Sequence, residues 1–320
     1  MLIKESAAAM LIAFALDAAI GWPSGLYERI GHPVTWLGRL IGFGDHGLNL
    51  EKSSNLERRS VGACFALFII LLVVSVTLNI TRLLPKDFTG VVLTGVLAWP
   101  LVATRSLHDH VAAVAKPLVA GDLAGARRAV SMIVGRNPDL LDNAGIARAA
   151  AESLAENTAD GVVAPLFWGV VFGLPGIAAY KAINTMDSMI GHRSPRHEAF
   201  GWAAARIDDL ANLIPARVTG FLFALVALHP ATAVQIMLRD AHAHRSPNAG
   251  WPEAAFAGAL GIRLSGPRVY DGRIANEPWL NGTAPDPQAE DLVRGLRLYH
   301  KAMIALALML LGITLFAEAI

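Results

Sequence analysis

The chain has 320 residues, of which 54% are hydrophobic and only 17% are charged, below the roughly 25% charged that soluble domains carry. The formal net charge of +1 argues against a nucleic-acid-binding surface, and the single cysteine, Cys64, excludes an intrachain disulfide framework and a cysteine-based metal site. The composition therefore predicts an integral membrane protein.

Apolar segments predict where the chain is embedded in the membrane. The clearest is 60–81, which lies between Arg59 and Arg82 and has no charge. As a helix it reaches about 33 Å, enough to cross a bilayer core. Five further segments are apolar: 6–22 (which contains Asp17 and which we interpret as a retained helix), 88–104, 161–180, 218–238 and 302–316. We predict an all-α, polytopic integral membrane protein with four to six membrane-embedded helices in a single domain, 1–320.

The fourth apolar segment leaves the topology open, because Pro165 and Pro175 lie within 161–180. Proline is tolerated at membrane depth where neighbours satisfy the freed backbone groups, so this segment either spans or is re-entrant. If all six segments span, 19 of the 27 Lys and Arg residues fall in loops on one side, which would be cytoplasmic. A re-entrant segment would instead place 148–160 and 181–217 on the same side.

A first polar cluster begins in the stretch "RAAAESLAENTADG", residues 148–161. On a helix, charges spaced by four positions share one face, as do Arg148, Glu152, Glu156 and Asp160. Like charges at this spacing repel, which favours a bound cation such as Mg²⁺, a cation that prefers oxygen ligands. Asn157 offers a neutral oxygen nearby. The alternative interpretation is a solvated face at the end of a surface helix.

A second polar cluster follows in "YKAINTMDSMIGHR". Helical spacing puts Lys181, Asn184 and Ser188 on one face, with Asp187 nearby and Arg193 just beyond. Ionisable residues within or beside membrane segments are functional candidates by default.

A third cluster follows in "GWAAARIDDLANLIPARVTG". Asp208 and Asn212 lie four residues apart, Asp209 is adjacent, and Arg206 and Arg217 flank them. The alternative here is a capped helix start or a structural ion pair. Together the three clusters favour a transferase or ligase over a passive pore, since Mg²⁺ and basic side chains clamp phosphate while a carboxylate handles a proton.

Other common signatures are missing from the sequence. It contains no GxxxxGK[ST], GxGxxG, HExxH or GxSxG motif, so any nucleotide site is unconventional. The histidine pairs at 108/110 and 242/244 have a spacing that points their side chains apart on a helix, and we do not predict metal ligation by them. The region 245–285 is rich in turn residues around one short Ala-rich helix, and a long irregular loop is often functional.

Several blocks of this sequence resemble the CobD/CbiB family of cobalamin biosynthesis proteins, the adenosylcobinamide-phosphate synthases. The blocks include "IVGRNPDLLDNAGIARAAAESLAENTADGVVAPLFW", "AYKAINTMDSMIGH", "FGWAAARIDDLANLIPARVTG" and "SPNAGWPEAAFAGALGIRLSGP". The resemblance extends from "LDAAIGWP" and "GHPVTWLGRL" to "EPWLNG", most of the chain. It implies a multi-pass inner-membrane enzyme that uses ATP and Mg²⁺ to join a propionate carboxylate of adenosylcobyric acid to aminopropanol or its O-phosphate through an amide bond. Membrane lipid and other late corrin-pathway membrane enzymes are the further partners it implies, and nucleic acid is not among them.

The resemblance and the clusters together give a hypothesis for the site. Mg²⁺ ligation or steering of the substrate aminium is assigned to Glu152, Asp160, Asp208 and Asp209. Phosphate clamping is assigned to Lys181, Arg193 and Arg217, with Asn157 and Asn184 as further substrate contacts. Proton transfer is assigned to Glu156 or Asp187, so that the predicted catalytic set is Glu152, Glu156, Asp160 and Asp187.

Two departures from the family pattern limit this hypothesis. The chain has Gly21-Trp22-Pro23 where the family often has G-D-P, and Gly135-Arg136-Asn137-Pro138 where the family often has G/S-R-D-T. The aspartate of each family pattern is therefore replaced in this chain, by Trp22 and by Asn137. Two rival functions stay open: a corrinoid transporter or scaffold, which no inverted repeat supports, and an intramembrane Mg²⁺-dependent diphosphate transferase, which requires two facing acidic motifs.

Overall fold

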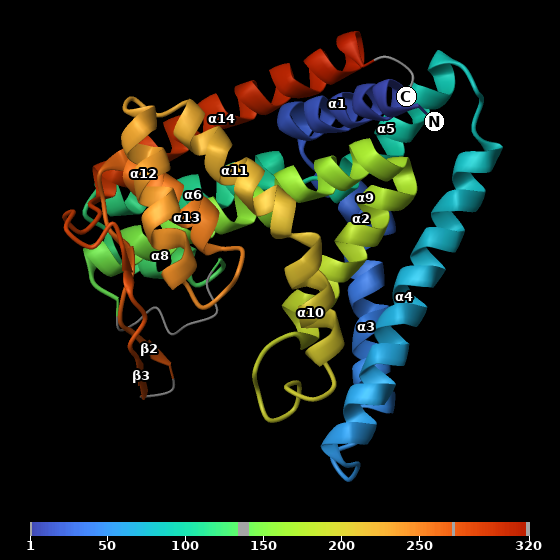
Figure 1. Ribbon diagram of the computed structural model, residues 1–320, viewed down its shortest axis with the longest axis horizontal. Coiled ribbons are helices and arrows are strands. Elements are labelled where there is room, and N and C mark those ends of the chain that lie inside the picture. The colour runs from blue at the N-terminus through green and yellow to red at the C-terminus, as the bar shows by residue number, and fades with distance from the viewer. Residues whose placement is uncertain (1, 134–140, 271–272, 318–320) are drawn as a thin grey trace. The chain divides into compact units, whose positions relative to one another are not determined.

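The computed structural model describes residues 2–133, 141–270 and 273–317, which are mostly helical (Figure 1). Gly135 and the rest of the 135–138 departure lie outside them. Within the described residues, four helical stretches are long and apolar enough to cross a membrane: Asn55–Leu83, Phe88–Val119, Asn143–Ile190 and Ala289–Phe316. The predicted all-α polytopic membrane class is confirmed.

The chain divides into two compact units. The first unit comprises Met1–Ala103, Ala164–Asn212 and Met309–Ile320. Its elements are α1 (Ile3–Ile20), α2 (Ser24–Ile30), α3 (Pro33–Leu48), α4 (Asn55–Leu83), α5 (Phe88–Ala98), a 3₁₀ turn (Trp99–Leu101), α9 (Ala164–Ile190), α10 (Trp202–Ala211) and the end of α14 (Ala289–Phe316). The single domain 1–320 stays a prediction.

The longest membrane helix of the first unit, α4, contains the predicted segment 60–81. It begins with a capping box, in which Ser54 Oγ accepts from the Glu57 amide at 3.3 Å and Glu57 Oε2 accepts from the Ser54 amide at 2.8 Å. Large apolar side chains such as Phe68 and Leu71 are more than half exposed. An exposed apolar face is what a lipid-facing helix requires. The first segment, 6–22, forms α1, which is not among the candidate spans.

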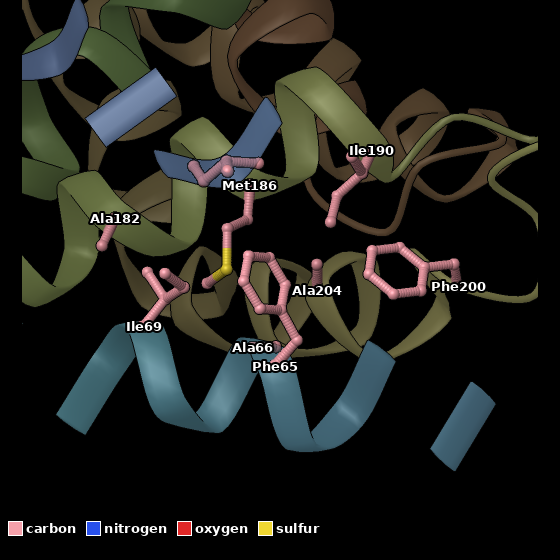
Figure 2. Close-up of a cluster of buried hydrophobic side chains, with 9 residues drawn as sticks. Phe65, Ala66, Ile69, Ala182, Met186, Ile190, Phe200 and Ala204 are labelled. Carbon is pink, nitrogen blue, oxygen red and sulfur yellow. The ribbon is translucent and has the colours of Figure 1, made fainter. Parts of the chain in front are cut away.

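A hydrophobic cluster fixes α9 and α10 against α3 and α4 (Figure 2). Its buried members are Ile41, Phe65, Ala66, Ile69, Ala182, Met186, Ile190, Phe200 and Ala204. On α9 the three members are spaced by four residues and form one face. The polar residues Lys181, Asn184 and Asp187 therefore lie on other faces of the same helix, away from this cluster.

The predicted segment 161–180 is not a straight helix. Gly173 has φ 66° and ψ −151°, a conformation that glycine adopts without steric cost, and Pro175 follows it. A Cβ added at Gly176 would lie 2.1 Å from the Trp168 carbonyl oxygen, so the backbone turns tightly there. A bend of this kind is what a re-entrant segment needs, and the choice between spanning and re-entrant stays a prediction.

The second unit comprises Thr104–Val163 and Leu213–Leu308. Its helices are α6 (Thr104–Val119), α7 (Leu123–Val130), α8 (Asn143–Thr158), a π-helical turn (Ala159–Val163), α11 (Leu213–Leu225), α12 (Pro230–Asp240), a 3₁₀ turn (Ala241–Ala243), α13 (Gly250–Leu260) and most of α14. Its strands are β1 (Leu264–Ser265), β2 (Arg268–Tyr270), β3 (Arg273–Ala275) and β4 (Trp279–Leu280). β1 pairs with β4 and β2 with β3, both antiparallel.

The prediction of one membrane helix over 218–238 is wrong. α11 ends at Leu225 and α12 begins at Pro230, a residue that starts helices but cannot continue the hydrogen bonding of a preceding one. With 13 and 11 residues, each helix is shorter than the roughly 20 residues a bilayer core requires.

The core of the second unit depends on two Ala-rich helices, α8 and α13, which pack on each other. Most residues of both helices are buried, on all faces. Small side chains let helix backbones approach closely, and a helix apolar on every face belongs in a protein interior. Glu152 is therefore buried because the helix that contains it is buried on all faces.

Candidate active site

Three carboxylates of α9 and α10, Asp187, Asp208 and Asp209, form what we call the acid cluster. Asp208 is buried, with 8% of its surface exposed. Burial first, and then the negative charge of Asp187, raise the pKa of Asp208 to about 7, although hydrogen bonding from the Asn212 amide opposes the rise. Asp209 adds a further like charge. The acid cluster thus collects negative charge that the fold itself leaves unfavourable.

The side chain of Asp208 is held by a short chain of hydrogen bonds. Asn212 Nδ2 donates to Asp208 Oδ2 at 3.0 Å, and Tyr180 Oη donates to Asn212 Oδ1 at 2.9 Å. The donation from Tyr180 fixes which way the Asn212 amide points. Asn184 also lies within hydrogen-bonding range of the Asp208 carboxylate and opposes the rise of its pKa. The buried Oδ1 of Asp208 has no hydrogen bond of standard geometry from the described residues.

Basic residues lie near the acid cluster. Arg206 Nη1 lies 2.9 Å from Asp209 Oδ2. Burial raises the pKa of Asp209, and the positive charges of Arg206 and Arg193 oppose that rise. His192 lies within electrostatic range of Asp187. Arg193, predicted as a phosphate clamp, is therefore near Asp209, in reach of a ligand that carries both a cationic and an anionic group.

Asp187 is set in place by the end of α9. A Cβ at Gly191 would lie only 2.0 Å from Asp187 Oδ1, so this position needs glycine. The loop that follows is anchored by Arg196, whose carbonyl oxygen accepts from Asn49 Nδ2 at 2.9 Å and also from Arg58. These contacts hold the segment that carries His192 and Arg193.

The anchor continues through Asp45 on α3. Arg196 Nε donates to Asp45 Oδ2 at 3.1 Å, and Asn49 Nδ2 donates to Asp45 Oδ1 at 2.8 Å. Although burial raises the pKa of Asp45, the hydrogen bonds from Asn49, Arg196 and His197 hold it below its ordinary value. Asp45 is therefore a structural carboxylate, unlike Asp208.

Lys181 on α9 lies near residues of two N-terminal motifs. Burial first, and then the charge of Lys181, lower the pKa of His32. The His32 ring packs edge-on against Trp22 with 5.0 Å between centroids. His32, from the motif "GHPVTW", therefore lies within electrostatic range of Lys181, and Trp22, from "GWPSG", packs against His32.

The predicted stripe on α8 is not the uniform face that its spacing suggested. Glu152 is buried and its Oε1 accepts from the Ser265 amide at 2.7 Å, whereas Glu156 is exposed. Asn157 is exposed and donates back to the Ser153 carbonyl of its own helix at 2.9 Å. The assumption of a regular helix through Asp160 is wrong, because α8 ends at Thr158 and Asp160 lies in the π-helical turn. The wider turn changes the angular step that put Asp160 in line.

Arg148, the basic residue of that stripe, forms an ion pair within the second unit. Asp286 binds Arg148 (3.2 Å, Nη1 to Oδ1) and Arg263 (2.6 Å, Nη2 to Oδ2). The Trp279 ring has both guanidinium carbons near it, at 4.8 Å and 4.1 Å from its centroid. This set links α8 to the β1–β4 region by charge pairing and stacking.

The predicted site residues fall into both units. Those of the second unit are Glu152, Glu156, Asn157, Asp160 and Arg217; those of the first are Lys181, Asn184, Asp187, Arg193, Asp208 and Asp209. Residues 2–133, 141–270 and 273–317 contain no group of three or more His, Cys, Asp or Glu residues able to hold a metal ion. The assignment of Glu152, Asp160, Asp208 and Asp209 to Mg²⁺ stays a prediction.

The sequence-based site omitted residues that the structure places beside it. Tyr180 and Asn212 orient Asp208, and His32 lies near Lys181. The four-residue spacing of Asp208 and Asn212 signalled their hydrogen bond. Nothing local signalled Tyr180 or His32, because both contacts are tertiary.

The fold and the acid cluster define a class: a polytopic helical membrane protein with ionisable side chains gathered beside its candidate membrane helices. The model of the CobD/CbiB protein family matches residues 10–299, so the chain belongs to that family. It is similar to "Cobalamin biosynthesis protein CobD" of Rhodobacter capsulatus (62% identical over 95% of this chain and 96% of that protein), of Brucella suis (47%, over 91% and 92%) and of a Sinorhizobium species (45%, over 96% and 97%). No solved structure matches the chain.

Proposed function

We propose that this protein forms the amide bond between a propionate carboxylate of adenosylcobyric acid and aminopropanol or its O-phosphate, giving adenosylcobinamide or its phosphate. Membership of the CobD/CbiB family and the names of its relatives support a role in cobalamin biosynthesis. The observation that carries the choice of site is Asp208, a buried carboxylate beside the like charges of Asp187 and Asp209, with a pKa raised to about 7 although Asn212 and Asn184 hydrogen-bond to it.

The acid cluster suits the amine partner of this reaction. An aminium group entering beside Asp187, Asp208 and Asp209 offsets their mutual repulsion, as a cation does for any group of like charges. The aminium first gives one proton to Asp208, which with a pKa of about 7 is poised to take it near neutral pH. The neutral amine then attacks the activated carboxyl carbon, the carbon–nitrogen bond forms, phosphate leaves, and the nitrogen gives its second proton to the departing phosphate. Arg193 and Lys181 supply positive charge for the phosphate of a phosphorylated amine.

ATP with Mg²⁺ supplies the activation of the carboxylate, most simply as an acyl phosphate, with phosphate as the leaving group. This part of the proposal depends on the family resemblance. Mg²⁺ commonly enters such sites with the nucleotide phosphates and only one or two protein carboxylates, which agrees with the lack of a three-residue ligand group in the described chain. We further propose the inner membrane as the location and other late corrin-pathway enzymes as neighbours.

One assay tests the proposed reaction. Purified protein in detergent is incubated with adenosylcobyric acid, ATP, Mg²⁺ and either aminopropanol or aminopropanol phosphate, and the corrinoids are analysed by mass spectrometry. We expect an amide product with at least one amine, and none when ATP is omitted. No product with either amine would contradict the proposal and favour the transporter or scaffold alternative.

A further inference from the structure

Arg217, near the start of α11, has an unusual setting among the arginines of the second unit. Most of the others in the described chain pair with a carboxylate: Arg105 with Asp109, Arg148 and Arg263 with Asp286, Arg239 with Asp240, Arg245 with Glu277, and Arg294 with Asp291. Among the described residues, Arg217 has no carboxylate partner, and burial is the only influence on its ionisation. A half-buried guanidinium without a counter-ion is electrostatically unfavourable.

Two contacts hold the Arg217 guanidinium in one orientation. Its Nη1 donates to Asn248 Oδ1 at 2.8 Å, and its carbon lies 4.4 Å from the Trp251 ring centroid. Asn248 is buried, and its backbone N–H donates a hydrogen bond to Ser246 Oγ at 3.2 Å. One face of the guanidinium is therefore engaged by the indole and one nitrogen by the amide, while the other N–H groups keep their capacity to donate.

The neighbours of Trp251 in the described chain direct no carboxylate at Arg217. His242 is exposed and packs edge-on against Trp251, with 5.0 Å between centroids. The carboxylate in the first turn of α13, Glu253, faces His244 instead, with 3.7 Å between Oε1 and Nε2. Since His244 Nδ1 accepts from the Ser246 amide, a neutral His244 carries its proton on Nε2, directed at Glu253.

We propose that Arg217, oriented by Asn248 and Trp251 and accompanied by His242, binds the phosphate group of a substrate. A planar guanidinium binds phosphate through two parallel hydrogen bonds, and pre-orientation removes the entropy cost of ordering it. The inference rests on the proposed function, which supplies two phosphate sources, ATP and aminopropanol phosphate. Both share the chemistry that the site recognises.

The test is direct binding of ATP and of aminopropanol phosphate, measured by isothermal titration calorimetry on the full chain in detergent. We expect Arg217→Gln to weaken one of the two ligands by about tenfold or more, because a charge-assisted bidentate contact is lost. Loss of ATP binding alone assigns the site to the nucleotide, and loss of aminopropanol phosphate binding alone assigns it to the amine. Arg128→Gln, at an exposed arginine of the same unit, is the matched control and should bind both ligands as wild type does.

A second variant separates binding from folding. Asn248→Asp keeps the shape and the acceptor oxygen but gives Arg217 a carboxylate partner, so phosphate binding should fall by about tenfold or more while the thermal midpoint does not decrease. The inference is overturned if wild type binds neither ligand, or if Arg217→Gln and Asn248→Asp bind both ligands as tightly as wild type. Because binding is measured without turnover, phosphate binding that depends on Arg217 would stand even if no amide product forms.

Discussion

The α8 stripe (Arg148, Glu152, Glu156 and Asp160) and the acid cluster both contain acidic residues beside apolar segments. The partners of their charged side chains in the folded protein differ. On α8, Glu152 accepts a backbone amide from β1 and Arg148 is paired with Asp286. In the acid cluster, Asp208 is buried beside Asp187, and its pKa rises to about 7. Charge spacing in sequence marks both places, and only the tertiary partners show where charge remains unfavourable in the folded protein.

This difference suggests separate roles for the two regions. Carboxylates that are satisfied by backbone amides or arginines stabilise the fold, whereas a buried carboxylate near like charges costs stability and is typical of functional sites. We therefore propose that the chemistry takes place at α9 and α10 and that Glu152 has a structural role.

The largest effect is expected from Asp208→Asn, which should lower amide formation by about 10²-fold or more because the proton acceptor is lost. The same substitution should increase the stability of the folded protein near neutral pH. Because burial raises the pKa of Asp208 from 3.8 to about 7, the folded state binds the proton more tightly than the unfolded state, and wild-type stability falls as pH rises through that range. Thermal midpoints of both proteins between pH 4 and pH 8 measure this, and Asp208→Asn should lose less stability over that range.

The next effect concerns the position of Asp187. Gly191→Ala places a methyl group about 2.0 Å from Asp187 Oδ1, which forces the carboxylate or the loop to move. We expect about tenfold less activity and a destabilisation of about 1–3 kcal/mol. Gly312→Ala is the matched control, since a Cβ there meets no atom within 4 Å. Equal activity of the two variants would show that the position of Asp187 does not matter.

A smaller effect is expected on the α8 side. Asp286→Asn removes the partner of Arg148 and Arg263 and should lower the thermal midpoint by about 2–4 °C, with folded protein keeping most of its activity. Asp109→Asn, at an exposed pair with Arg105, should change the midpoint less. Differential scanning fluorimetry and the amide assay make the comparison.

The smallest effect is expected from Glu152→Gln, which keeps an oxygen that accepts from the Ser265 amide. Activity should stay within about threefold of wild type, whereas Glu152→Ala should cost about 1–3 kcal/mol of stability by leaving that buried amide without its acceptor. An inactive but stable Glu152→Gln would restore Glu152 to the site, as the sequence-based hypothesis had it.

Local patterns in the sequence predicted part of this fold. The charge-free run 60–81 identified α4, and the four-residue spacing of Asp208 and Asn212 agrees with the hydrogen bond between the end of α10 and its C-cap residue. Sequence patterns gave wrong predictions where a backbone irregularity or a distant partner determines the structure. Pro230 divides 218–238 into two helices, and Glu152 accepts a hydrogen bond from Ser265, more than a hundred residues along the chain. Hydropathy averages over such breaks, and helical spacing carries no information about tertiary partners.

The candidate site could likewise be predicted from the sequence only in part. Each acidic cluster was visible in sequence, but which one stays electrostatically unfavourable depends on the packing of α9 against α10 and on the glycine that admits Asp187. The setting of Arg217 was also hidden, because Asn248 and Trp251 lie in a region whose turn-rich sequence gave no residue-level signal.

The pH dependence of amide formation tests the central claim most directly. Rates for wild type and Asp208→Asn, measured from pH 5 to pH 9 at limiting amine, should differ in shape: wild type gains a rising limb with a midpoint near 7 that the variant lacks. Both proteins share the ionisation of the amine itself, so any difference reports on the enzyme. Identical profiles and rates for the two proteins would contradict the assignment of Asp208 as the proton acceptor.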